Sequence, residues 1–221
     1  MSNLTPFLVA NFKANKKTGD EISNWIDTVN EKVEDFRGTV IIAPPYTNLA
    51  QTDWKLKSIN SKIKLSSQDL SKFEQGAYTG EVTASLLSDL CAYSIIGHSE
   101  RRQNFNETDE VLETKVQMAT SAKIQPIFCI QAVDTLIPKG VNVVAYEPIF
   151  AIGTGNPDTP QNAKEIAKKV KEKGEYTILY GGSVTAENVK SFLEENVIDG
   201  VLVGGASQNP QSFATIIEAA K

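Results

Sequence analysis

Eight short apolar runs recur along the chain, separated by longer stretches in which apolar residues follow a helical period. The runs are almost continuously apolar in the middle, as parallel strands are when both faces of their sheet are covered. We therefore expect eight parallel strands, in the segments PFLVANFK, GTVIIAPP, KIKLSSQD, YSIIGHS, IQPIFCI, VNVVAYEP, YTILYGG and DGVLVGGAS.

The stretches between the runs carry helix start signals. Thr18 and Glu21 have the spacing of a capping box, and apolar residues follow at helical intervals. Thr159 and Asn209 each precede a proline, a residue that suits the first position of a helix. We expect Thr185 to start a further helix in the same manner. Strands alternating with helices predict an α/β protein.

Eight such units in 221 residues favour one closed (β/α)8 TIM barrel, a single domain over residues 1–221, rather than an open doubly wound sheet. No Pro/Ser-rich linker or low-complexity segment divides the chain. The interval QAVDTLIPKG after the fifth run is too short for a normal crossover, which takes a dozen or more residues. The fifth helix should therefore be shortened or missing.

Composition and charge exclude several classes of protein. A net charge of −5 with interspersed charges does not suit nucleic acid or an anionic membrane as a partner. No segment approaches the roughly 20 apolar residues of a membrane span, and the first residues do not resemble a secretory signal, so we expect a cytoplasmic protein. Cys91 and Cys129 lie far apart without metal-ligand spacing, and we expect both to be buried and reduced.

Polar side chains follow several strands at the ends where barrel enzymes carry their active sites. Asn11 and Lys13 follow the first strand, His98 follows the fourth and Glu147 follows the sixth. Each residue alone would more often be a surface charge or a structural histidine. Their common position at strand ends favours a catalytic mouth with one cation, one imidazole and one carboxylate.

Glycine pairs follow the last two strands, Gly181 and Gly182 after the seventh and Gly204 and Gly205 after the eighth. Glycine allows backbone N–H groups to approach an anion closely, and these two loops are the frequent phosphate site of the barrel. A tight turn alone would explain either pair, but both pairs at adjacent strand ends favour phosphate binding.

The segment AIGTG, which contains Gly153 and Gly155, is not a nucleotide-binding loop. It lacks the third glycine of the dinucleotide fingerprint, and no Gly-Lys-Ser/Thr sequence follows. It lies between YEP and NPDTP, which should stiffen both of its ends. We therefore expect a mobile lid that excludes water from the site.

Six blocks occur in one order: ANFKANK, SSQDLSKFEQGAYTGEVTA, IIGHSERR, AYEPIFAIGTG, YGGSV and DGVLVGGAS. They resemble the signature blocks of the triosephosphate isomerase family over nearly the whole chain, except after Cys129. The resemblance implies interconversion of dihydroxyacetone phosphate and D-glyceraldehyde 3-phosphate, by proton abstraction through an enediol(ate) intermediate. This is a reaction of glycolysis and gluconeogenesis that needs neither a metal nor an organic cofactor.

The resemblance also implies roles for individual residues. Glu147 matches the catalytic base, His98 the electrophile and Lys13 the cation that stabilises negative charge. In this family a helix N-terminus keeps the histidine neutral, and HSERRQ should begin such a helix. Glu100 matches an acidic position whose role stays open. The substrate-binding positions would be Asn11, Lys13, Gly153, Ser183, Gly204 and Gly205.

Residues 71–82 resemble the segment that projects into a second subunit in this family. The resemblance implies a homodimer in which Thr79 approaches Asn11 of the partner subunit. Two alternatives stay open at this point. Another phosphate-binding barrel enzyme, such as a sugar-phosphate epimerase or lyase, would share the glycine loops, and a catalytically impaired barrel scaffold would keep the fold without turnover.

Overall fold

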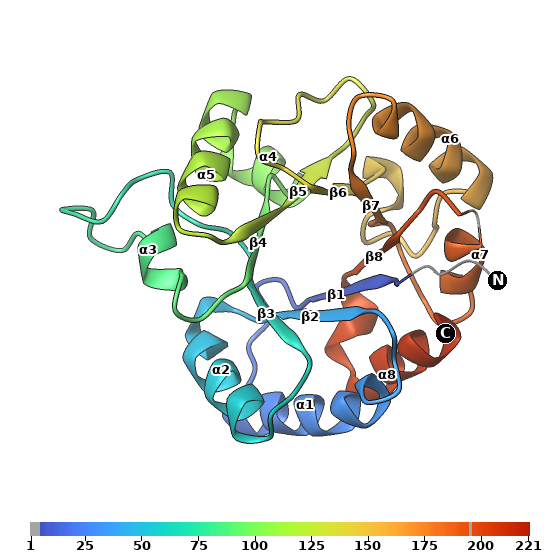
Figure 1. Cartoon of the computed structure of the whole chain (residues 1–221), viewed down its shortest axis with the longest axis horizontal. Coiled ribbons are helices and arrows are strands. Elements are labelled where there is room, and N and C mark those ends of the chain that lie inside the picture. Colours follow the sequence, from blue (N-terminus) through green and yellow to red (C-terminus); the bar gives the residue numbers. More distant parts are fainter. Residues whose placement is uncertain (1–4, 195) are drawn as a thin grey trace.

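The protein forms a closed barrel of eight parallel strands surrounded by helices (Figure 1), as described by a computed structural model for residues 5–194 and 196–221. Each strand pairs with the next, and the first pairs with the last through the register Phe7↔Gly200. The expected barrel is confirmed, and the open sheet is excluded. The strands are β1 (Phe7–Asn11), β2 (Thr39–Ala43), β3 (Lys64–Ser67), β4 (Tyr93–Ile96), β5 (Gln125–Ile130), β6 (Val143–Tyr146), β7 (Thr177–Tyr180) and β8 (Gly200–Val203).

Helices and short 3-10 turns connect the strands and cover the outside of the barrel (Figure 1). The helices are α1 (Gly19–Val33), α2 (Leu49–Ser58), α3 (Ala84–Leu87), α4 (Ser99–Phe105), α5 (Asp109–Ser121), α6 (Pro160–Lys171), α7 (Val189–Leu193) and α8 (Pro210–Ala219). The 3-10 turns are η1 (Tyr46–Asn48), η2 (Ile149–Ala151) and η3 (Gly205–Gln208).

Three of the four expected helix starts are confirmed. Thr18 forms the capping box, and the side chains of Thr159 and Asn209 accept backbone N–H groups in the first turns of α6 and α8. The expectation for Thr185 is wrong, because the residue that precedes α7 is Asn188, whose side chain accepts the Thr185 N–H at 2.9 Å. The chain makes one turn there, and α7 begins only after Asn188.

The connection between β5 and β6, residues 131–142, contains no helix, which confirms the expectation for this interval. Its Ile137 packs against the apolar layer outside the barrel. Lys173, just after α6, donates to a backbone carbonyl of the connection. Phe128 of β5 and Val144 of β6 belong to the same outer layer and remain buried. An extended strap therefore covers this part of the barrel wall.

Alternate side chains of most strands form two apolar layers, as the pleat of a strand requires. Val9, Ile41 and Leu179 point into the barrel, whereas Leu8 and Ile42 pack against the outer helices. Both layers are almost fully buried. Such packing holds the strand ends in fixed positions around a common mouth.

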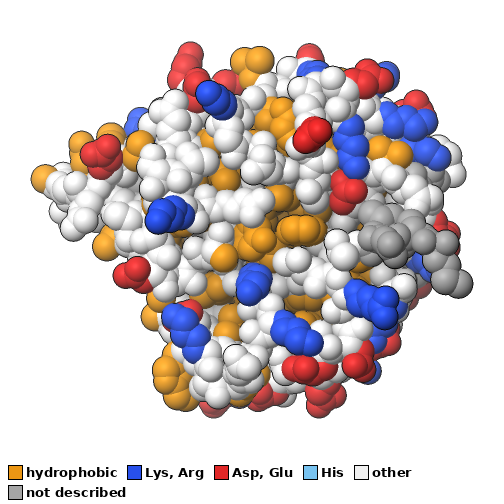
Figure 2. Space-filling model, in the orientation of Figure 1, with side chains coloured by type: hydrophobic (Ala, Val, Ile, Leu, Met, Phe, Trp, Pro, Cys, Tyr) orange, Lys and Arg blue, Asp and Glu red, His pale blue; other side chains and the backbone are white. Residues whose placement is uncertain are grey.

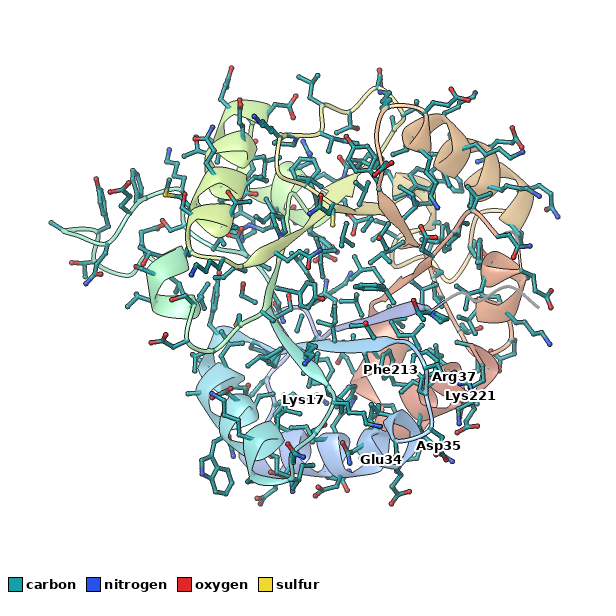
Figure 3. The ribbon with its side chains drawn as sticks, viewed as in Figure 1. Lys17, Glu34, Asp35, Arg37, Phe213 and Lys221 are labelled. Atoms are coloured by element: carbon teal, nitrogen blue, oxygen red, sulfur yellow. The ribbon has the colours of Figure 1, made fainter. Side chains whose placement is uncertain are left out.

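The outer helices also contact one another. Helix α1 packs against α8, where Lys32 lies 3.5 Å from Glu218. Figure 3 labels Glu34, directly after α1, together with Phe213 of α8 and Lys221, which follows α8. None of the described helices is both long enough and apolar enough to span a membrane.

Residues 71–82 project from the barrel between β3 and α3, at the left of Figure 1. The projection is closed at its base by a hydrogen bond from Ser71 N–H to the Val82 carbonyl at 2.8 Å. Within it, the rings of Phe73 and Tyr78 stack with centroids 4.1 Å apart. Figure 2 shows hydrophobic side chains on the surface of this projection.

Candidate active site

A cavity of about 280 Å³ lies at the carboxyl ends of the strands. It is lined by all eight residues to which the family resemblance assigned a catalytic or substrate-binding role: Asn11, Lys13, His98, Glu147, Gly153, Ser183, Gly204 and Gly205. Residues from five different strand ends and from the lid segment therefore meet in one place.

The carboxylate of Glu147 lies against the imidazole of His98. Glu147 Oε1 is 3.1 Å from His98 Nε2, and Glu147 Oε2 accepts the backbone N–H of Ser99 at 2.8 Å. Glu147 directly follows β6, and its own N–H donates to the Ile130 carbonyl of β5. Only 1% of Glu147 is exposed, and 6% of His98. The pair is thus held in place by neighbouring strands and shielded from water.

The proton of the His98 imidazole can be assigned to one nitrogen. His98 is the N-cap of α4, and its Nδ1 accepts the backbone N–H of Glu100 at 3.2 Å. A nitrogen that accepts a hydrogen bond carries no proton, so the neutral ring has its N–H at Nε2. That N–H faces the Glu147 carboxylate. The helix expected from HSERRQ is therefore present and selects the tautomer.

Lys13 has a backbone conformation that lysine rarely adopts, with φ of +53°. Its N–H donates to Asn11 Oδ1 at 2.9 Å, and its carbonyl accepts from Gln68 Nε2 at 2.8 Å. Its ammonium group forms an ion pair with Glu100. Neighbouring side chains thus hold an unfavourable backbone conformation at the cavity, as is common at functional sites.

The glycine pair after β8 forms one wall of the cavity. Gly204 is the N-cap of η3, and Gly205 is its first residue. A Cβ atom at Gly204 would lie 3.3 Å from Cε of Lys13, which is tighter than an ordinary contact. The missing side chain therefore leaves room for the lysine beside the backbone of this turn.

The loop after β7 contacts the lid through Ser183. Its hydroxyl donates to the Ala151 carbonyl at 2.6 Å and accepts the Gly155 N–H at 3.2 Å. Gly182 of the same loop does not line the cavity. A Cβ atom there would approach the Tyr180 hydroxyl to 2.6 Å, so packing accounts for this glycine.

The lid segment is tied to the barrel on both sides of its glycines. It begins in η2, and Gly153 and Gly155 adopt positive φ of 69° and 78°. At its far end, the Asp158 N–H donates to the Tyr180 hydroxyl of β7 at 2.7 Å. The two glycines are the positions at which this backbone depends on freedom from a side chain. Mobility of the lid stays a prediction.

The family model for triosephosphate isomerase matches residues 6–220. This chain belongs to the triosephosphate isomerase family. The triosephosphate isomerase of Caldanaerobacter subterraneus subsp. tengcongensis is 37% identical over 246 aligned residues, which cover 96% of this chain and 98% of the relative. That of Dictyoglomus turgidum is 36% identical, with 95% and 97% covered, and that of Mesomycoplasma hyopneumoniae strain 7448 is 34% identical, with the same coverage. The first alignment is longer than the 221 residues of this chain, so that relative has segments without a counterpart here.

Sequence reasoning missed several groups around this triosephosphate isomerase site. It did not identify the Ser99 N–H that holds Glu147, because every residue has a backbone N–H. It assigned no role to Gln68, which also donates to the Ala43 carbonyl at 2.9 Å and so fixes Lys13 to β2. The only signal for Gln68 was its place within one of the family blocks.

A buried cluster of charged residues was also missed. Lys115 Nζ lies 2.6 Å from both Asp69 Oδ1 and Glu107 Oε1, and Arg101 Nε lies 2.7 Å from Glu107. Burial raises the pKa of Asp69, and the neighbouring Lys115 charge opposes that rise. The sequence signal for this cluster was Lys115, a lysine on the apolar face of α5 beside the buried Val116.

Both cysteines are free and buried, as expected. Burial raises the pKa of Cys129 well above its usual value, and the negative charge of Glu147 adds to the rise. The described residues contain no group of three or more His, Cys, Asp or Glu side chains arranged to hold a metal ion.

Proposed function

We propose that this chain interconverts dihydroxyacetone phosphate and D-glyceraldehyde 3-phosphate through an enediol(ate) intermediate. The proposal rests above all on the 3.1 Å approach of the Glu147 carboxylate to His98 Nε2, at a cavity that Lys13 also lines. Relatives named triosephosphate isomerase that align with nearly the whole chain support the same reaction.

In the proposed reaction Glu147 is the base. Its carboxylate takes the proton from the carbon beside the substrate carbonyl, and the electron pair moves to the carbonyl oxygen. His98 donates a hydrogen bond from Nε2 to that oxygen and moves a proton between the two oxygens of the enediol(ate). Glu147 then returns its proton to the adjacent carbon, so that no atom is gained or lost.

The remaining residues of the proposed site bind the anion. The Lys13 ammonium group stabilises the negative charge that develops on the substrate oxygens, with Asn11 beside it. The backbones of Gly204 and Gly205, with Ser183 opposite, would bind the phosphate. Gly153 would join them from the lid, which excludes water and so suppresses loss of phosphate from the intermediate.

The direct test compares Glu147→Gln with the wild type in a coupled assay on glyceraldehyde 3-phosphate. A carboxamide cannot accept the proton, so we expect kcat to fall about 10²–10⁴-fold. Glu172→Gln, which neutralises an exposed carboxylate after α6, is the matched control and should retain full activity. Equal rates for Glu147→Gln and wild type would show that Glu147 is not the base.

Binding of 2-phosphoglycolate separates the alternatives. Its carboxylate mimics the enediolate, and we expect tight binding by calorimetry. A folded protein that binds this compound without turnover would be the impaired scaffold. A protein that binds inorganic phosphate but not this compound would be another phosphate-dependent barrel enzyme, such as an epimerase or lyase.

We also propose that the protein is a homodimer assembled through residues 71–82, with Thr79 near Asn11 of the partner subunit. The projection with its stacked aromatic rings supports this, because Tyr78 is 45% exposed. A groove lined by Tyr46 and Phe105, and by residues at the base of the projection itself, is the proposed site for the partner's projection. Sedimentation should give a dimer for the wild type and a monomer for Tyr78→Asp, whereas Leu136→Asp, at an exposed apolar residue outside this region, should remain dimeric.

We further propose that residues 1–221 form one domain and that the protein is cytoplasmic. The continuous ladder from β1 to β8 supports a single cooperative unit. Unfolding should give one transition with coincident fluorescence and circular dichroism curves. Fractionation of cells should recover the protein with the cytoplasmic contents.

A further inference from the structure

We propose that Trp25, on α1, is a positioning residue for the phosphate-binding turn formed by residues 204–208. It lies outside the cavity and touches no substrate. The inference rests on the proposed function, because it assigns phosphate binding to that turn. The decisive contact is a hydrogen bond from Trp25 Nε1 to the Ser207 carbonyl, 2.7 Å long, between segments 182 residues apart.

This contact is buried and continues toward the cavity. Trp25 is 1% exposed and Ser207 is fully buried. The Ser207 hydroxyl donates to the Gly204 carbonyl at 2.7 Å and lies 3.4 Å from the Asn11 carbonyl. The indole N–H is therefore linked through one residue to the phosphate turn and to the end of β1.

Aromatic packing determines where the indole N–H points. The Trp25 ring meets Phe12 edge to face, with centroids 5.3 Å apart, and lies 5.4 Å from Phe213 of α8. Phe12 stands between Asn11 and Lys13 in the chain, and Phe213 follows the turn in α8. The capping box of Thr18 fixes the start of α1 two turns earlier. Trp25 therefore contacts three segments that meet at the phosphate turn, through Phe12, Ser207 and Phe213. We call this set of contacts the brace.

Loss of this donor should affect anion binding more than proton transfer. The Ser207 carbonyl would become a buried acceptor without its partner, so the turn would shift to find another donor. The turn carries the backbone groups that face the anion. Glu147 follows β6 and His98 follows β4, away from the brace, and their contact would be preserved. The expected signature is a change in KM with little change in kcat.

The chain offers a matched control, because it contains two tryptophans. Trp54 is 68% exposed on α2. We expect Trp25→Phe, which keeps a buried aromatic ring without the N–H, to raise KM for glyceraldehyde 3-phosphate about five- to tenfold. The Kd values for inorganic phosphate and 2-phosphoglycolate should rise by the same factor, while kcat stays within about twofold. Trp54→Phe should match the wild type in all four quantities.

A second variant separates the hydrogen bond from packing. In the Trp54→Phe background, Trp25 can be replaced by β-(3-benzothienyl)alanine, which keeps the indole shape but has sulfur in place of N–H. Phosphate affinity weakened as in Trp25→Phe would support the brace. Affinity equal to that of Trp54→Phe, or a fall in kcat without a change in KM, would overturn it. Absence of turnover in Trp54→Phe itself would count against the proposed function. The phosphate affinities of Trp54→Phe and the benzothienyl variant could still be compared, and that comparison would still test the brace.

Discussion

The Lys13 ammonium group forms an ion pair with Glu100, although 87 residues separate them in the chain. The backbone N–H of the same Glu100 donates to Nδ1 of His98. A single residue in the first turn of α4 therefore contacts both the cation and the imidazole of the site. This arrangement suggests that Glu100 orients Lys13 while its backbone orients His98.

Glu100→Gln should lower kcat/KM about tenfold, because the neutral amide holds the Lys13 ammonium group less firmly in position. Stability should change little, since the Glu100 side chain is 42% exposed and such pairs contribute about 0–1 kcal/mol. Steady-state kinetics and thermal unfolding measure the two effects. Glu165→Gln removes an exposed pair with Lys168 on α6 and should leave kinetics unchanged. Unchanged kcat/KM in Glu100→Gln would mean that Lys13 is positioned by its backbone alone.

Tyr180→Phe should destabilise the protein by about 1–3 kcal/mol, because it leaves the buried N–H of Asp158 without an acceptor. For a chain of this size, the Tm should fall by about 2–4 °C per kcal/mol. The lid would lose its attachment to β7, so kcat/KM should also fall. Tyr176→Phe, for which the structure gives no hydroxyl hydrogen bond, is the control. A Tm shift of the same size in both variants would show that removal of a tyrosine hydroxyl as such, and not loss of the hydrogen bond to Asp158, is responsible.

Lys115→Met should destabilise the protein by about 3–5 kcal/mol at neutral pH, because it leaves two buried carboxylates with Arg101 as their remaining cation. Burial already raises the pKa of Asp69, and removal of the lysine would raise it further. An acid with a raised pKa binds more protons in the folded state, so folding becomes more favourable as pH falls through that range. The deficit of Lys115→Met should therefore shrink from pH 8 to pH 5.

Urea midpoints of Lys115→Met and wild type at the two pH values measure this deficit. Lys168→Met, which removes an exposed lysine, should differ little from wild type at either pH. A deficit that grows toward pH 5 would contradict the assignment of Asp69 as the titrating group.

Neither thiol should react with Ellman's reagent in the native protein at pH 8. Burial raises the pKa of Cys91 to about 12, which leaves about 10⁻⁴ of it as thiolate at this pH. Cys129 is fully buried, and burial together with the Glu147 charge raises its pKa. Guanidinium should release two reactive thiols per chain. Rapid reaction of one thiol in the native state would contradict the burial described here.

Much of this fold could be predicted from the order of its apolar and polar residues. Eight buried runs at regular spacing are compatible with few architectures. The sequence also showed that residues 131–140 are too few for a normal crossover with a helix. The start of α7 was not predictable in the same way. Thr185 and Asn188 are both good capping residues, and the order of residues does not show which of them directly precedes the helix.

The candidate site was predictable where a side chain stands at a strand end, as Glu147 and His98 do. It was not predictable where the contribution comes from the backbone or from a distant helix. The positive φ of Lys13 goes against the backbone preference of lysine, so the residue type at this position predicts a different conformation. The contact of Trp25 with Ser207 depends on how α1 packs beside η3, which no local pattern records.

The strap of residues 131–142 has a consequence for barrels in general. The sheet closes through its own ladder of hydrogen bonds, and β5 and β6 keep their register although no helix joins them. Closing the sheet into a barrel and covering its outer face are therefore separate requirements. A dozen residues of irregular backbone can meet the second one. A gene for such a barrel can lose a helix from its wall while the carboxyl ends of the strands, where the reacting groups lie, keep their geometry.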